Sequence, residues 1–136
     1  MIRAVIDTNV LFSGLTNDDN TSDLVVQAWH AKLFQACVST AVALEYDDVL
    51  SRKLSSDGWQ YARRALRTLL DLAAPVAIHF SWRPASNDPG DNLIIDCALN
   101  ANAIVVTYNK RDFRLAQREL GLQVMNAAEF LELLSA

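Results

Sequence analysis

The sequence predicts an α/β domain on a central, mainly parallel sheet of four to five strands flanked by helices. Two observations lead to this class. Short apolar runs of strand length alternate along the chain with longer segments whose apolar residues recur at helical spacing. No repeat, low-complexity stretch or long linker interrupts the alternation, so residues 1–136 are expected to form one domain around a single core. Strands that alternate with helices are typical of parallel sheets.

Each expected strand is a short, mostly apolar run that suits a buried parallel strand. In chain order these runs are residues 2–6, 36–38, 76–80, 103–107 and 122–125. The helices carry an apolar stripe and a start or stop signal, such as the N-cap candidates Thr21-Ser22-Asp23 or the helix breaker Pro75. They are expected over residues 8–15, from 21–23 to about 34, from 39–40 to 50, from 59 to about 73, from about 91 to 102, from near 110, and after 125. Residues 14–20 and 81–89 are expected to be loops.

Composition narrows the class of protein. The chain is 51% hydrophobic and 21% charged, and its net charge of −4 argues against a protein that coats nucleic acid through bulk positive charge. No apolar run reaches the roughly 20 residues of a membrane span, and the first residues do not have the pattern of a signal peptide. Cys37 and Cys97 sit in apolar stretches and are expected to be buried, reduced thiols, which favours a cytoplasmic location.

Polar residues follow several of the expected strands, where open α/β sheets bind their ligands. Asp7 follows the first strand with no turn residue between, Ser39 and Thr40 follow the second, and residues 107–109 follow the fourth. A buried carboxylate at Asp7 needs a partner, because an unpaired buried charge is costly. The alternative is that Asp7 caps the helix that starts near Val10.

Two further acids lie on helices. Glu45 borders the apolar stripe of its helix, whereas Asp47 and Asp48 fall on the opposite side. Glu45 can therefore reach into a cleft, or it can form a salt bridge to a nearby base. Asp91 opens a helix that is apolar almost all round, and it is either a functional acid or a cap worth about 1 kcal/mol.

The last candidates lie near the fourth strand. Asp96 shares a polar stripe with Asn92, and this stripe is either solvated or the wall of a groove. Asn109 and Asp112 are three residues apart and share a face if a helix has begun there, but both also suit turn and N-cap positions.

Together these side chains form a set of hard oxygen ligands from separate elements, which suits Mg²⁺ or Mn²⁺. No cluster of His and Cys competes for a softer metal, since His30 and His79 stand apart. The chain has four glycines and no glycine-rich phosphate loop, which makes a P-loop or Rossmann nucleotide site a poor fit.

With these residues in view, the chain resembles the PIN-domain family, specifically the VapC-like toxin halves of toxin–antitoxin pairs. The resemblance spans nearly the whole chain. It is carried, in order, by Val5-Ile6-Asp7-Thr8-Asn9-Val10-Leu11, residues 39–50 with Glu45-Tyr46, Asp88-Pro89-Gly90-Asp91-Asn92, residues 103–107, residues 109–113 and residues 124–131.

The resemblance implies a single three-layer PIN-like domain with an acidic quartet that binds metal. The quartet maps onto Asp7, Glu45, Asp91 and a fourth place around Asn109 and Asp112. Many PIN domains carry Asp at the position of Asn109, and this departure bears on the affinity for metal and on the number of ions. Asp96 matches a position that is often acidic in relatives. Polar residues that orient the carboxylates are implied at Thr8, Asn9, Ser39 and Thr107.

The implied activity is hydrolysis of phosphodiester bonds in RNA with one or two Mg²⁺ (or Mn²⁺) ions. Asp7, Glu45, Asp91 and Asp112 are the implied catalytic residues. Lys110 and Arg111 flank the implied site and are expected to contact RNA phosphates. Arg63, Arg64 and Arg67 project from the outer side of their helix, where a solvated face is the alternative. The implied partners are an antitoxin protein and a second copy of the chain in a homodimer, with no membrane.

Two other readings stay open. A receiver-like or dehalogenase-like phosphotransfer domain also uses an aspartate at the end of a strand, but no paired acid precedes Asp7 and no second Asp stands two positions after it. A PIN fold that has lost its metal and acts as a binding module is favoured by Asn109. The set Asp7, Glu45 and Asp91 argues against it, because three carboxylates without a cation repel one another.

Overall fold

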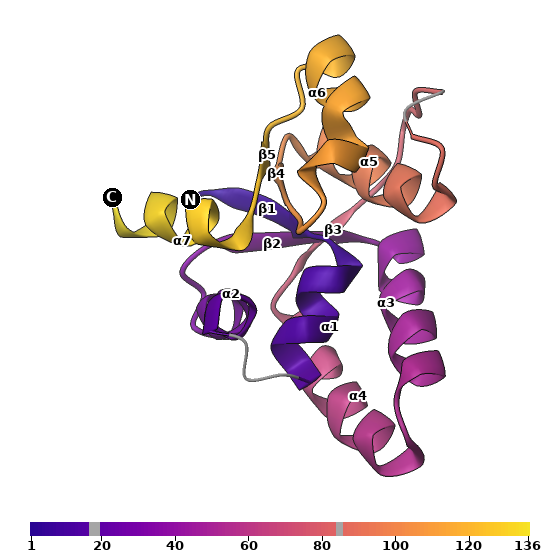
Figure 1. The fold of residues 1–136 in the computed structure, drawn as a ribbon, viewed down its shortest axis with the longest axis vertical. Coiled ribbons are helices and arrows are strands. Elements are labelled where there is room, and N and C mark those ends of the chain that lie inside the picture. The colour runs from indigo at the N-terminus through magenta and orange to yellow at the C-terminus, as the bar shows by residue number, and fades with distance from the viewer. Residues whose placement is uncertain (17–19, 84–85) are drawn as a thin grey trace.

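The computed structural model, which describes residues 1–16, 20–83 and 86–136, contains one five-stranded sheet (Figure 1). All neighbouring strands are parallel, in the order β3-β2-β1-β4-β5. Their bounds are Arg3–Ile6 (β1), Gln35–Ser39 (β2), Ala74–Val76 (β3), Ile104–Val106 (β4) and Val124–Met125 (β5). The predicted α/β class with a parallel sheet is therefore confirmed.

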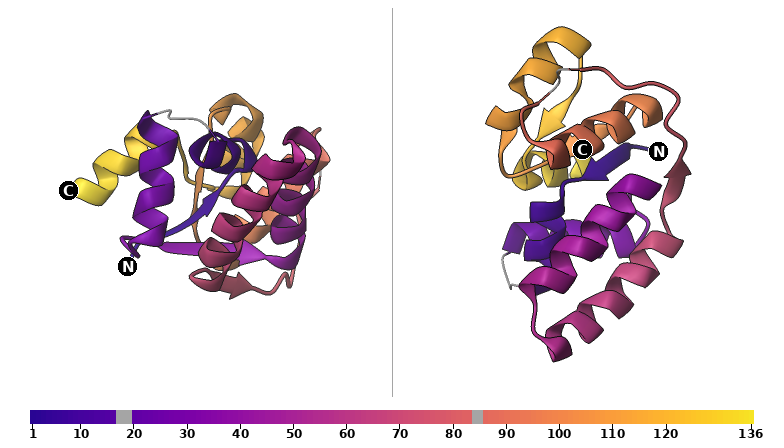
Figure 2. Two further views of the ribbon diagram at one scale, coloured as in Figure 1. Left: turned by 90° about the horizontal axis from the view of Figure 1, so that it is seen from below. Right: turned by 90° about the vertical axis from the view of Figure 1, so that its right-hand side faces the viewer.

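Helices cover both faces of this sheet (Figures 1 and 2). The described helices are α1 (Thr8–Thr16), α2 (Asn20–His30), α3 (Thr40–Lys53), α4 (Ser56–Asp71), α5 (Pro89–Ala101), the 3₁₀ helix η1 (Lys110–Phe113), α6 (Arg114–Leu120) and α7 (Ala127–Ser135). Helices α1 to α4 lie on one side of the sheet and α5 and α6 on the other, while α7 packs against α2 and β5. None of the helices in the described ranges is both long and apolar enough to cross a bilayer.

The core lies between these layers, and the apolar runs of the sequence form it. The central strands β1 and β4 are buried, with Val5 and Val105 fully inaccessible to solvent. Phe34 packs edge-on against Phe130, at 4.9 Å between ring centroids, and this contact joins the start of β2 to α7. Cys37 and Cys97 are free and buried, as predicted.

The third strand lies earlier in the chain than the sequence predicts. It spans Ala74–Val76 in place of residues 76–80, so Pro75 stands inside a strand. This is possible because β3 is an edge strand, where a residue without an N–H need not pair on its outer side. The predicted strand residues 77–80 instead begin an extended connection toward α5.

The first predicted loop is also partly wrong. Helix α1 continues to Thr16, and α2 begins at Asn20 and includes the three residues expected to cap it; residues 17–19 lie outside the described residues. Gly14 lies inside α1, where α2 passes too close to leave room for a side chain. A Cβ at this position would lie 2.5 Å from Val26 Cγ2 and 2.6 Å from the Ser22 carbonyl oxygen.

The strand order places the ends of β1 and β4 side by side. The chain passes from β1 to β2 on one side, while β4 pairs with β1 on the other, with Ile6 opposite Val106. Parallel sheets bind ligands at such a point, where the strand order reverses. The residues that follow these two strands, Asp7 and Thr107, are consequently neighbours.

Candidate active site

Asp7 is held by contacts from both strands that meet at the reversal. Its backbone N–H donates to the Val106 carbonyl oxygen at 2.9 Å. One carboxylate oxygen accepts from the Thr8 backbone N–H at 2.8 Å, and the other accepts from the Thr107 hydroxyl at 2.7 Å. The side chain is buried, at 7% exposure, and this burial raises the pKa of Asp7 although both hydrogen bonds lower it. The two hydrogen bonds thus orient the carboxylate but do not offset the full cost of burying its charge.

The hydroxyl of Thr107 connects Asp7 to the next turn of the chain. Thr107 is fully buried, and its oxygen also accepts from the Asn109 backbone N–H at 3.1 Å. This geometry agrees with the role implied for Thr107 in orienting a carboxylate. Asn109 itself is exposed and precedes η1, which carries the exposed Asp112.

Replacing Thr107 by valine is expected to raise the pKa of Asp7 further and to lower the free energy of unfolding at pH 7 by about 2 kcal/mol. Valine has the same shape but cannot donate to the ionised carboxylate, and it leaves the Asn109 N–H without its acceptor. NMR titration of the Asp7 carboxyl carbon and urea unfolding measure the two effects. The exposed Thr40→Val serves as the control, and an unchanged Asp7 titration in Thr107→Val would contradict this assignment.

Tyr46 fixes α3 to the same end of the sheet. Its side chain is fully buried, and its hydroxyl donates to the carbonyl oxygen of Ile6, the residue before Asp7. The sequence pattern does not predict this bond. Because Glu45 precedes Tyr46 on the helix, the bond also fixes where Glu45 leaves α3. A Cβ added at Gly90 would lie 3.4 Å from Glu45 Oε1, so Glu45 reaches the start of α5.

The start of α5 contributes two aspartates with different tasks. Asp88 is the N-cap, and its side chain accepts from the Gly90 backbone N–H at 2.8 Å, with Pro89 at the first helical position. The capping role considered for Asp91 therefore belongs to Asp88. Asp91 lies inside the first turn, partly buried, and accepts a 3.3 Å hydrogen bond from the Ser86 hydroxyl.

Asp7, Asp88, Asp91 and Asp112, which we call the acidic cluster, share one electrostatic field. Burial, together with the charges of Asp7, Asp88 and Asp112, raises the pKa of Asp91 to about 6. The charges of Asp112 and Asp88 likewise raise the pKa of Asp7. The four carboxylates come from the residue after β1, from the N-cap and first turn of α5 and from η1, and none of the ion pairs among the described residues includes any of them. The cluster is an unneutralised concentration of negative charge.

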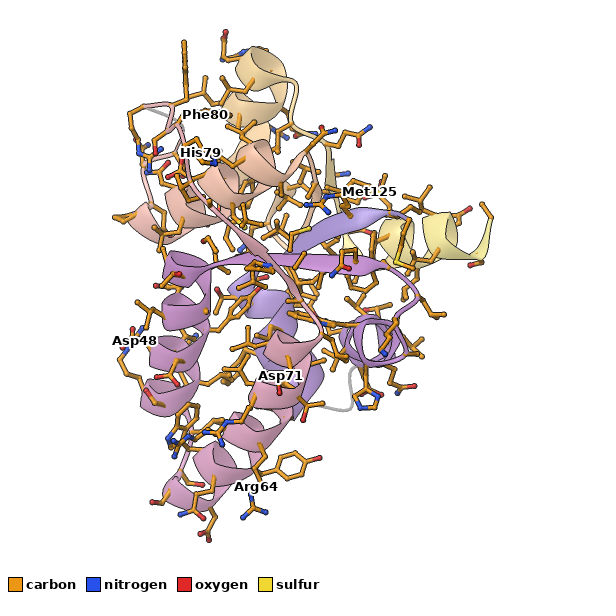
Figure 3. All side chains as sticks on the ribbon, turned by 180° about the vertical axis from the view of Figure 1, so that it is seen from behind. Asp48, Arg64, Asp71, His79, Phe80 and Met125 are labelled. Carbon is orange, nitrogen blue, oxygen red and sulfur yellow. The ribbon has the colours of Figure 1, made fainter. Side chains whose placement is uncertain are left out.

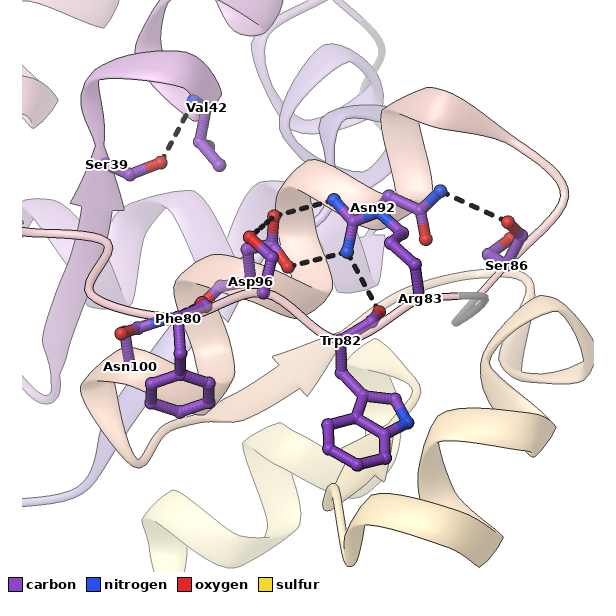
Figure 4. A network of polar contacts seen from close by, with 10 residues as sticks. Ser39, Val42, Phe80, Trp82, Arg83, Ser86, Asn92, Asp96 and Asn100 are labelled. Atoms are coloured by element: carbon purple, nitrogen blue, oxygen red, sulfur yellow. Dashed lines mark hydrogen bonds and ion pairs between the residues drawn. The ribbon is translucent and has the colours of Figure 1, made fainter.

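Asp96 does not join the acidic cluster (Figure 4). Its carboxylate forms a two-point ion pair with the Arg83 guanidinium at 2.8 and 2.9 Å, and it accepts from the Ser81 hydroxyl at 3.1 Å. On the same helix, Asn100 accepts from the His79 N–H and donates to the Phe80 carbonyl oxygen, each at 2.9 Å. The polar stripe of α5 thus binds the connection that follows β3.

Three other residues predicted for the site contact different parts of the structure. Ser39 caps α3, accepting from the Val42 N–H at 3.2 Å (Figure 4). Thr8 contributes its backbone N–H, given above, to Asp7. Lys110 forms a 2.9 Å ion pair with Glu129 at the start of α7. Lys110 is thereby directed toward α7.

An open groove of about 590 Å³ lies beside the acidic cluster. Asp88, Asp91 and Asp112 line it together with Arg111, which the sequence predicted as a phosphate contact. Arg114 and Arg118 line it too, and sequence reasoning missed them. Their signal was the i, i+4 spacing within the helix predicted from near residue 110, and it gains meaning only once the groove beside α6 is known.

The atoms around Asp7 that could bind a metal are carboxylate and amide oxygens, which are the ligands that Mg²⁺ and Mn²⁺ prefer. Two buried side-chain oxygens, Asn9 Oδ1 and Asn92 Oδ1, have no hydrogen-bond partner among the described residues, and they stand two residues after Asp7 and one after Asp91. Within the described ranges, however, no three side chains of His, Cys, Asp or Glu are arranged to hold one ion. The site thus has the chemistry of a metal centre, and its side chains would have to move together to close around an ion.

The fold and the site together place this protein among the α/β domains that carry an acidic site at the carboxyl edge of a parallel sheet. A family model described as a PIN domain matches residues 3–111. The chain therefore belongs to the PIN-domain family, as the resemblance predicted. The alternative of a receiver-like or dehalogenase-like phosphotransfer domain is therefore wrong. No curated protein matches the chain.

Solved structures agree with this fold. VapBC2 from Rickettsia felis bound to a promoter DNA fragment matches with a TM-score of 0.68 and 17% identity, over 92% of this chain and 98% of that one. VapBC-1 from nontypeable Haemophilus influenzae gives 0.65 and 15%, over 93% and 99%. FitAB bound to an IR36 DNA fragment gives 0.63 and 15%, over 91% and 94%. At these identities the likeness describes the fold.

Proposed function

We propose that the protein is a Mg²⁺- or Mn²⁺-dependent endoribonuclease that hydrolyses phosphodiester bonds in RNA. The observation that carries this proposal is the acidic cluster, four carboxylates at the strand-order reversal, of which Asp88, Asp91 and Asp112 line a groove together with arginines. Carboxylates that repel one another destabilise the fold unless a cation lies between them. This cost supports a cation-binding role for the cluster. The PIN family and the VapC-like fold of its structural neighbours support the reaction class.

The residues proposed to hold the ion are Asp7, Glu45, Asp91 and Asp112, with the amide oxygen of Asn109 as a neutral ligand. Asp88, which the sequence did not single out, adds charge to the same field. A bound divalent ion would polarise the scissile phosphate and lower the pKa of a water molecule. Asp96 is left out of this set, because Arg83 already neutralises it.

The chain's own residues would perform the remaining work. Arg111, Arg114 and Arg118 line the groove, and guanidinium groups match phosphate oxygens in two-point hydrogen bonds. Arg118 is also paired with Glu119 at 3.2 Å, so Arg111 and Arg114 are the main proposed phosphate contacts. Thr107 keeps Asp7 oriented, and the bond from Tyr46 to Ile6 keeps α3 in place relative to β1. One of the carboxylates near the groove would accept the proton of the attacking water.

An antitoxin partner, a homodimer and a cytoplasmic location belong to the same proposal. The structural neighbours from Rickettsia felis and Haemophilus influenzae are VapBC proteins, and FitAB is a further neighbour. Co-expression of this chain with a small protein encoded beside it, followed by growth and co-purification, tests the antitoxin partner. Growth arrest that no neighbouring small protein relieves would contradict it.

The test of the activity is cleavage of a mixed RNA pool by the purified chain at pH 7 with Mg²⁺, with Mn²⁺, and with EDTA. Cleavage is expected with either ion and is expected to disappear with EDTA, because the carboxylates alone supply no positive charge to the scissile phosphate. Sequencing of the new RNA ends identifies the target. Cleavage that survives EDTA would refute the metal-dependent mechanism.

A PIN fold that only binds is the second candidate, and the open arrangement of the carboxylates favours it. Thermal unfolding with and without Mn²⁺ separates the two candidates. A nuclease site is expected to raise the melting temperature in Mn²⁺ and to lose this shift in Asp91→Asn. A binding module would show no shift in either protein.

A further inference from the structure

One face of α4 carries three arginines that the proposed reaction does not use. Gln60, Arg63, Arg64 and Arg67 are spaced i, i+3, i+4 and i+7, so they form one stripe along the helix. The opposite side of α4 carries Ala62, Leu66 and Leu69, which are buried. The stripe, which we call the arginine stripe, is exposed and surrounds a surface hollow of about 420 Å³. Figure 3 shows Arg64 pointing away from the domain.

The positive charge of the arginine stripe is not neutralised. None of the ion pairs among the described residues includes Arg63, Arg64 or Arg67. Like charges three and four residues apart destabilise a helix. The arginine of α3, Arg52, is in contrast paired with Asp48 at 3.0 Å. A protein of net charge −4 thus keeps three adjacent unpaired cations at a cost to its stability.

An exposed aromatic ring lies next to the stripe. Tyr61 is 71% exposed and stands three residues before Arg64 on the same helix. Proteins that bind single-stranded nucleic acid combine cations that follow the phosphate backbone with aromatic rings on which bases stack. An acidic peptide would use the arginines but would leave the ring without a stacking partner. The pairing of Tyr61 with the stripe therefore favours RNA over an acidic protein segment.

We infer that the arginine stripe binds the phosphate backbone of RNA outside the cleavage site, with Tyr61 as a stacking platform. This inference rests on the proposed ribonuclease function and extends its substrate. Helix α4 and the helices α5 and α6 that border the groove lie on opposite sides of the sheet (Figure 1). An RNA that contacts both the stripe and the groove therefore has to run around the edge of the sheet, which an oligonucleotide bound only in the groove does not do, so the substrate is a long or folded RNA.

The experiment compares Arg63→Gln/Arg64→Gln/Arg67→Gln with the wild type, and the single Arg64→Gln with its control Arg52→Gln. Glutamine keeps helix propensity while it removes charge. Binding of a fluorescent polyuridine RNA of about 20 nucleotides is measured in EDTA over a range of salt, since each contact with a single-stranded phosphate contributes about 0.7 to the salt slope. The triple variant is expected to lose about 2 from this slope. Arg64→Gln is expected to lose more of the slope than Arg52→Gln.

Cleavage supplies the second readout. With Mg²⁺, the triple variant is expected to lose about tenfold or more in kcat/KM on the 20-nucleotide RNA and nothing on an RNA of about four nucleotides that fits the groove. An unchanged salt slope, or equal losses from Arg64→Gln and Arg52→Gln, would overturn the inference. Loss of binding to polyglutamate with RNA binding retained would also overturn it and assign the stripe to an acidic protein. If the wild type cuts no RNA, the proposed function fails, while the slopes still decide the stripe.

Discussion

The Asp7→Asn protein is expected to cleave RNA about 10³-fold more slowly than the wild type and, without metal, to unfold at a higher temperature. Burial makes the ionised form of Asp7 costly, as its raised pKa records, and the charges of Asp88 and Asp112 add to this cost. Asparagine has the same shape. Its amide oxygen can accept from the Thr8 N–H, and its amide nitrogen can donate to the Thr107 oxygen, so both polar contacts keep a partner.

The two effects together separate a ligand from a structural residue. If Asp7 only caps a helix or packs in the core, Asp7→Asn will be less stable than the wild type. If Asp7 is a cation ligand whose charge is costly without the ion, Asp7→Asn will be more stable than the metal-free wild type. Initial cleavage rates in Mg²⁺ and thermal unfolding in EDTA measure both. Asp47→Asn, an exposed position on α3, is the matched control and is expected to change neither. Cleavage within tenfold of the wild type in Asp7→Asn would contradict the mechanism.

The affinity of the site for Mg²⁺ is expected to fall about tenfold between pH 7 and pH 5, because a group with a pKa of about 6 is mostly ionised at pH 7 and only about one-tenth ionised at pH 5. That group is Asp91, which must lose its proton before it can act as a ligand. Calorimetric titration with Mg²⁺ at pH 5, 6 and 7 measures the change. Asp112→Asn removes a neighbouring charge and is expected to shift the transition to lower pH.

The same shift has a consequence of opposite sign for the metal-free protein. The pKa of Asp91 is about 6 in the folded protein and 3.8, its ordinary value, in the unfolded chain. The folded protein therefore binds this proton more tightly. Stability is therefore lost as the pH rises from about 4 to about 6, on the order of 1 kcal/mol for this partly exposed group. Urea unfolding in EDTA at pH 4.5 and pH 7 measures this loss. Asp91→Asn is expected to reduce it and to leave the contribution of Asp7, whose pKa is also raised; an equal loss in the variant would assign all of it to other groups.

The sequence was sufficient for the fold because strands and helices differ in the spacing of their apolar residues. It also located Asp7 and Thr107, because in a parallel sheet the residue after a buried strand has to lie at the carboxyl edge. It misplaced the third strand, since Pro75 looks like a helix breaker until the strand is known to lie at the edge. Local pattern does not reveal which strands lie at an edge.

The site was less predictable where tertiary contacts decide. Asp96 and Lys110 were plausible by spacing, yet Arg83 and Glu129 bind them, and both partners are distant in the sequence. Asp88 was predicted only as part of the loop 81–89 and of the motif Asp88-Pro89-Gly90-Asp91-Asn92, because its effect on Asp7 and Asp91 acts through space. The position of Arg114 and Arg118 at the groove was unpredictable for the same reason, because the groove forms only where α6 meets the start of α5.

The connection after β3 sets a length requirement on the chain. Asn100 binds residues 79 and 80, and Asp96, four residues earlier on α5, binds residues 81 and 83. Four helical residues rise about 6 Å, and two extended residues span about 6.6 Å, so the two segments stay in step. Phe80 and Trp82 then point away from Asp96 (Figure 4). Inserting one residue here would turn these rings toward the polar stripe and displace Asp88, so this connection should tolerate substitutions far better than changes in length.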